Sequence, residues 1–168
     1  MAHTETAFIS QLTQTPPQRN KTHDGNTPTQ KIAGDVEFST TTAGDTLALF
    51  KIPVNAKLVS LKIGNDILAT TSGTLDVGFY QGDDLSTTSP GTVVLIDAIV
   101  SALSVTSAIA MTDYRYETLD LNTTNQVAWE LAGLTAQPDY GDFVIAVSVK
   151  AINTAATGTL AFIAEYTI

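Results

Sequence analysis

The sequence predicts an all-β protein, an antiparallel β-sandwich of jelly-roll type with an extended N-terminal arm. Charged residues make up only 15% of the 168-residue chain, against about 25% in an average soluble protein. Threonine replaces much of that polar surface, and its β-branched side chain suits strands better than helices. From Val36 onward, apolar and polar residues alternate with a period of two, which is typical of strands with one buried face.

The chain divides near residue 34. The stretch from Gln14 to Gln30 contains three prolines and no apolar residue, so it cannot bury enough surface to offset its own ordering entropy. We therefore expect residues 1–34 to form a polar arm and residues 35–168 to form one sandwich domain. A cluster of Phe8, Ile9 and Leu12 precedes the polar stretch and suits docking on a partner. A tail without fixed structure is the competing interpretation.

Turn-forming residues separate the alternating segments, as in Ala43-Gly44-Asp45 and Gln137-Pro138-Asp139-Tyr140-Gly141. The spacing predicts about eight or nine short strands, and eight is the number in a jelly roll. The alternation is clearest in segments 47–52, 58–63, 75–80, 126–131, 143–149 and 160–166.

One stretch, from Leu95 to Met111, does not follow the period. It predicts either a strand followed by a short helix over 98–103 or a buried loop that crosses one end of the sandwich. Trp129, which lies within an alternating segment, is expected to pack in the core.

The residues that usually carry catalysis are scarce. The chain has no cysteine, and its only histidines, His3 and His23, lie in the arm, where they cannot be held against a nucleophile. No glycine-rich phosphate loop is present. The net charge of −9 argues against nucleic acid, and no apolar stretch is long enough to cross a membrane. We expect no enzyme activity and no cofactor.

Carboxylates are the remaining candidates for a site. Asp76, Asp83 and Asp84 surround an expected turn and offer the oxygen ligands that Ca²⁺ prefers. Their spacing is not that of a dedicated calcium loop, and aspartate is common in turns. We therefore expect no metal site and keep these three residues as weak candidates.

Several short segments carry a family resemblance: Ala43-Gly44-Asp45-Thr46-Leu47, Phe50-Lys51-Ile52-Pro53 followed by Ala56-Lys57-Leu58, Leu75 to Tyr80, and Gly158 through Tyr166. Together they make the body similar to small virion proteins of tailed bacteriophages, of the head decoration or minor capsid type. In these proteins a strand ends at an apolar-proline turn and continues into a strand of small, basic and apolar residues.

The resemblance implies a jelly-roll sandwich that binds the outer surface of the capsid and stabilises the head, usually as a trimer. Its partner would then be the major capsid protein, and it would be made in the host cytoplasm and located in the virion. No catalytic residue is implied. The alternative is a fibre-type or carbohydrate-binding sandwich, which would use the tyrosines predicted in or near loops: Tyr80, Tyr114, Tyr116 and Tyr140.

Overall fold

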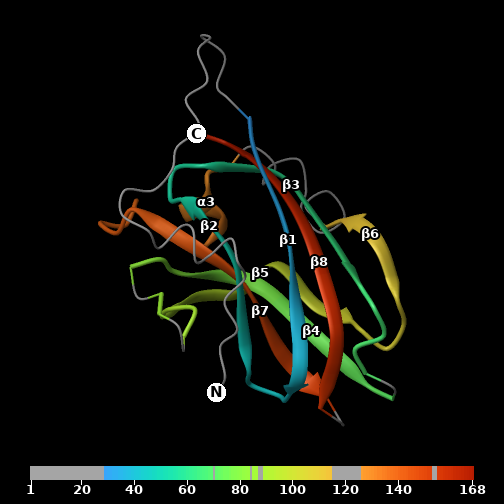
Figure 1. Ribbon diagram of the computed structural model, residues 1–168. Coiled ribbons are helices and arrows are strands. Elements are labelled where there is room, and N and C mark those ends of the chain that lie inside the picture. Colours follow the sequence, from blue (N-terminus) through green and yellow to red (C-terminus); the bar gives the residue numbers. More distant parts are fainter. Residues whose placement is uncertain (1–28, 70, 84, 87–88, 115–125, 153–154) are drawn as a thin grey trace.

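The computed structural model describes residues 29–69, 71–83, 85–86, 89–114, 126–152 and 155–168. They form two antiparallel four-stranded sheets packed face to face (Figure 1), which confirms the predicted β-sandwich. Sheet A has the order β1-β8-β3-β6 and sheet B the order β2-β7-β4-β5. The strands are β1 (Thr29–Thr41), β2 (Thr46–Pro53), β3 (Lys57–Asn65), β4 (Gly73–Gln81), β5 (Val93–Ser104), β6 (Ile109–Asp113), β7 (Asp142–Ile152) and β8 (Ala156–Thr167).

The strand pairing is that of a jelly roll. Strand β1 pairs with β8, β2 with β7, β3 with β6, and β4 with β5. The two halves of the chain are thus paired along their length, and the resulting ribbon is rolled into two sheets. Of these four pairs, only β4 and β5 are consecutive in the sequence. The other three join strands that are far apart along the chain, so the fold forms only when distant segments come together.

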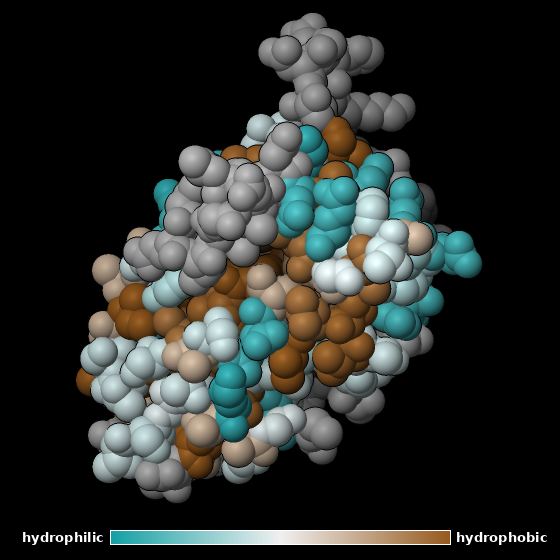
Figure 2. All heavy atoms as spheres, turned by 180° about the vertical axis from the view of Figure 1, so that it is seen from behind, coloured by the Kyte–Doolittle hydropathy of each residue, from teal (hydrophilic) through white to brown (hydrophobic). Residues whose placement is uncertain are grey.

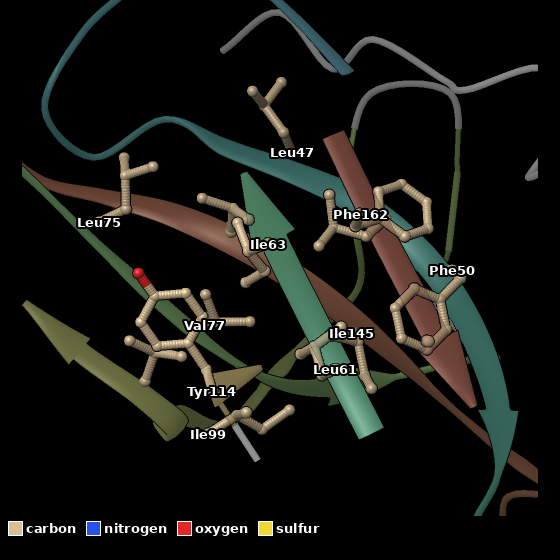
Figure 3. Packing of buried hydrophobic residues seen from close by; sticks show 14 of the residues in the cluster. Leu47, Phe50, Leu61, Ile63, Leu75, Val77, Ile99, Tyr114, Ile145 and Phe162 are labelled. Atoms are coloured by element: carbon tan, nitrogen blue, oxygen red, sulfur yellow. The ribbon is translucent and has the colours of Figure 1, made fainter. Parts of the chain in front are cut away.

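The core lies between the inner faces of the two sheets (Figure 3). Phe50 of sheet B stacks on Phe162 of sheet A with ring centroids 5.4 Å apart, and both rings are buried. On β1, Gly34 leaves room for the Phe162 ring, because a Cβ at this glycine would lie 2.9 Å from the ring's Cζ atom. Aromatic packing of this kind joins the two layers.

The outer faces of the two sheets differ. Sheet A presents charged and hydroxyl groups, including an ion pair between Lys31 and Glu165 at 3.3 Å. Sheet B instead carries a second buried apolar cluster of Ala48, Tyr80, Val144 and Ala146 on its outer side. Leu85, from the β4–β5 connection, packs against that cluster.

Strand β1 begins at Thr29, so residues 29–34, which the sequence analysis assigned to the arm, are paired with β8. The remainder of the arm, including Phe8, Ile9 and Leu12, lies outside the described residues.

The segment 126–131, predicted as a strand, is instead a helical turn, α3 (Ala128–Leu131). The N–H groups of Ala128 and Trp129 donate to the carbonyl groups of Ala56 and Val54. Gly133, with φ +74°, lies just after the turn in the left-handed conformation that commonly ends helices. Ala128 and Leu131 are buried at a spacing of three, and Trp129 is partly buried against the core.

The stretch 95–111 contains neither the helix nor the buried loop that its composition suggested. Strand β5 continues to Ser104, and β6 begins at Ile109. The period is lost because β5 bulges against β4: Val77 pairs with Val100 and Phe79 with Leu95. A step of two residues on β4 therefore faces a step of five on β5, which leaves three extra residues on β5.

The bulge passes over Gly78. A Cβ at this position would lie 2.0 Å from the carbonyl oxygen of Leu95 and 2.4 Å from the carbonyl carbon of Ile96, so only glycine allows the β5 backbone to approach β4 this closely.

We expect Gly78→Ala to destabilise the protein by about 1–3 kcal/mol, because the added methyl group must displace the β5 backbone. Gly141→Ala is the matched control, since no atom lies within 4 Å of its Cβ position, and its stability should change by no more than about 0.5 kcal/mol. Urea denaturation of both variants measures the difference. Equal stabilities would show that β5 does not need this approach.

Candidate functional site

Asp76 is buried on β4 and is occupied by protein contacts. Its Oδ1 accepts the N–H of Ala102 at 2.7 Å, and its carboxylate forms an ion pair with Lys150 at 3.4 Å. Ala102 has φ +56°, a left-handed conformation that is costly for a residue with a Cβ. Asp76 therefore holds a strained part of β5 against β4.

The structure does not bring Asp76 and Asp83 together. Asp76 lies within β4 and Asp83 beyond the end of that strand, so an extended chain separates them by roughly 15–20 Å. Asp84 lies outside the described residues. In the part of the chain that the structure describes, no three acidic or histidine side chains are grouped as metal ligands would be.

The tyrosines expected near loops have different environments. Tyr80 and Tyr114 are buried, and the Tyr80 hydroxyl hydrogen-bonds to the Ser148 hydroxyl. Tyr140 packs edge-on against Phe143 at a centroid distance of 5.5 Å. Tyr116 lies outside the described residues. The three described tyrosines therefore do not form a common exposed platform for a sugar.

Two tyrosines, Tyr166 near the end of β8 and Tyr140 just before β7, have a pKa above the ordinary value. Burial raises the pKa of Tyr166, and the charge of Asp142 adds to the effect. Burial also raises the pKa of Tyr140, with a contribution from Asp83. The raised pKa keeps each hydroxyl protonated to a higher pH than in an exposed tyrosine.

Large apolar side chains are exposed in several places on the described surface. The first group is on β5, where Val93 is 52% and Ile96 39% exposed. Figure 2 shows the side of the molecule that carries sheet B, with apolar residues gathered across its middle. Surface of this kind often marks a contact with another protein.

Two further apolar side chains are exposed toward the edge of sheet A opposite β1: Met111 of β6 is 41% exposed, and Ile67, in the connection after β3, is 56% exposed. Ile168, beyond the end of β8, is also 56% exposed. Beside Met111 is a shallow groove of about 380 Å³ between β3, β6 and the start of β8. The groove is lined by Gly64, Asn65, Asp66, Ile109, Ala110, Met111, Thr159 and Ala161.

The sequence analysis identified none of these surfaces, because it assigned apolar residues in strands to the core. One signal was available in the sequence: after Leu95 the two-residue alternation of apolar and polar residues is lost. A strand in this stretch therefore has more apolar residues than its core-facing side can bury. None of the described helices is long and apolar enough to span a membrane.

Asp76→Ala should lower stability by about 1–3 kcal/mol, because it leaves the N–H of Ala102 without its acceptor. Asp83→Asn, at a turn, should change stability by less than about 0.5 kcal/mol. Urea denaturation with and without calcium chloride measures both effects, and calcium should leave all midpoints unchanged. A calcium-dependent gain in the wild type that Asp83→Asn abolishes would restore the metal hypothesis.

No family model and no curated protein matches the chain. Among solved structures, a chain in the capsid of Ralstonia phage GP4 superposes with a TM-score of 0.61 at 19% identity, covering 98% of this chain and 96% of that one. A chain in the cyanophage Pam1 capsid asymmetric unit gives a TM-score of 0.51 at 17% identity, covering 92% and 94%. At these identities the likeness establishes a shared fold along nearly the whole length of the chain.

Proposed function

We propose that this chain is a structural protein of a bacteriophage virion that binds the outer surface of the capsid and stabilises the head. The observation that carries the proposal is the match, over 98% of the chain, to a chain of similar length in a phage capsid. A second phage capsid chain shares the same fold. The role proposed is structural and not enzymatic, with the major capsid protein as the partner.

The surface of the molecule supports this role. Among the described residues, exposed apolar side chains occur in three separate places, on β5, near β6 and at Ile168 after β8, so one copy can contact more than one neighbour. Several modest contacts that act together can hold a protein firmly on a particle. The net charge of −9 opposes binding to nucleic acid and limits self-aggregation before assembly.

The arm is the proposed contact segment, and the assembled unit is proposed to be a trimer. Phe8, Ile9 and Leu12 are its anchors, because they are the apolar cluster of a segment that is otherwise polar. The carbohydrate-binding alternative receives less support, since Tyr80 and Tyr114 are buried rather than presented to a ligand.

Deleting residues 1–28, which precede β1, should weaken co-sedimentation with empty phage capsids at least about tenfold, because the arm links each copy to its neighbours. A full-length variant with Phe8, Ile9 and Leu12 all changed to Ser should lose a similar amount. Light scattering of the wild type should give the mass of a trimer.

Thermal unfolding of both variants is the control, because an unchanged midpoint shows that the sandwich is intact. Wild-type protein that fails to sediment with capsids would contradict the proposed function. Undiminished binding by both variants would remove only the arm from it.

A further inference from the structure

We infer that the outer face of sheet A is a contact surface for a second copy of this chain, placed face to face about a twofold axis. The contact seats Ile163 of each copy over the groove beside Ala161 of the other. This inference goes beyond the proposed function and does not rest on it. Three features of the face support it: a shallow groove, a side chain that matches the groove, and charges of opposite sign at the two ends.

The groove on this face is shallow and mostly apolar. It lies over β3, between β8 and β6 (Figure 1), and Gly64 and Ala161 form its floor. These two residues pair with each other and belong to the outer face, because the neighbouring Ile63 and Phe162 are buried in the core. Met111 stands at the side of the groove and is 41% exposed. A floor without large side chains leaves room for one from a neighbouring molecule.

Ile163 is the matching side chain, and it lies beside the groove on β8. It is two residues from Ala161, so both belong to the outer face and are about 6–7 Å apart along the strand. Ile163 is partly exposed between Ala33 of β1 and Lys62 of β3. A twofold axis that lies between two facing sheets, and crosses β8 midway between these two residues, places Ile163 of each copy over Ala161 of the other. Each copy then gives one apolar side chain and receives one.

The charged residues of this face are divided between its two ends. The lysines of sheet A are all level with Ile163 or farther from the groove: Lys31, Lys57 and Lys62. Two carboxylates, Glu165 and Asp113, share that end and leave it one positive charge in sum. Beside the groove are three exposed carboxylates, and the described residues of this face place no lysine there: Asp35, Glu37 and Asp66. The two ends of the face therefore differ in the sign of their charge.

The same axis brings ends of opposite sign together. On β1, Lys31 and Glu37 are equally far from the axis on opposite sides, so Lys31 of one copy faces Glu37 of the other. On β3, Lys62 comes to lie over Gly64 of the other copy, with Asp66 within reach of its long side chain. A twofold axis parallel to the strands would instead oppose like charges. Charge complementarity thus selects the axis that also seats Ile163 over the groove.

A face that pairs with itself joins two copies only, and such a contact is called isologous. The proposed trimer needs heterologous contacts elsewhere on the molecule, so the twofold contact would link a copy of one trimer to a copy of the next. The net charge of −9 on each copy opposes the contact in dilute solution. It becomes effective where other contacts already hold the copies close together.

The absence of cysteine from the chain allows a test by cross-linking. Ala33→Cys places an exposed thiol on β1 next to the axis, where a short bis-maleimide can join it to the same residue of the second copy. Concentrated protein is treated in about 0.15 M salt, which screens charges beyond about 8 Å. We expect at least about tenfold more covalent dimer than with Ala151→Cys, because docking raises the effective concentration of the thiols. Ala151 is the matched control, an exposed alanine on β7 of sheet B.

Charge reversal distinguishes a self-complementary face from any other contact between copies. Two variants of the Ala33→Cys protein each reverse one end of the face: Lys31→Glu with Lys62→Glu, and Asp35→Lys with Glu37→Lys. Each variant alone should lose at least about tenfold in dimer yield, because like charges then face each other. An equal mixture of the two should restore the dimer, and the same changes in the Ala151→Cys protein should give none. Unchanged thermal midpoints show that the sandwich is intact.

Ile163→Asp in the Ala33→Cys protein should also abolish the dimer, and an unchanged yield would contradict the seating of Ile163 over the groove. A yield from Ala33→Cys no greater than that from Ala151→Cys overturns the inference, as does a mixture of charge-reversed variants that stays monomeric. These experiments need no capsids. Dimers without co-sedimentation therefore contradict only the proposed function, and co-sedimentation without dimers contradicts only this contact.

Discussion

Sheet A depends on the pairing of β8 with both β1 and β3. Strand β8 enters last in the chain and lies between two strands from the N-terminal half, and no other described strand links β1 to the rest of this sheet. The same strand carries Phe162 into the core, where it stacks on Phe50 of sheet B. Because these contacts join distant parts of the chain, the sandwich closes only after a large loss of chain entropy. The position of β1, and with it the point where the arm leaves, is a consequence of this closure.

On sheet B, two outward-facing residues of β4 control the path of β5. Gly78 has no side chain, which allows the β5 backbone to approach β4 closely at Leu95 and Ile96. Asp76 accepts the N–H of Ala102, which has a left-handed backbone conformation. The register between the two strands slips at both places. Bulges bend a strand and turn its side chains away from strict alternation, which is why β5 exposes Val93 and Ile96. The apolar surface of β5 is thus produced by contacts within the sheet.

The sequence predicted those elements whose side chains alternate without interruption. Strands β2, β4, β7 and β8 were expected from their period, because one face of each packs on the core. The α3 turn was wrongly predicted as a strand because six residues with apolar alternation fit either structure, and the deciding hydrogen bonds come from Val54 and Ala56, far away in the sequence. Asp76 was assigned to the surroundings of a turn, whereas it lies within β4. Its partners Ala102 and Lys150 are distant in the sequence, so the local pattern could not indicate them. The groove could not be foreseen, because it combines residues of β3, β6 and β8 that only the jelly-roll order brings together.

An eight-stranded sandwich that does not close into a barrel has sheet edges, and an exposed edge is a hazard for aggregation. Strand β6 is short, with five residues, and its last residue, Asp113, is anchored to Ser60 and Leu61 of β3. A short strand offers few backbone groups to a foreign strand, which limits unspecific pairing. The negative charge of the chain adds a repulsion between free copies, so both features act against aggregation.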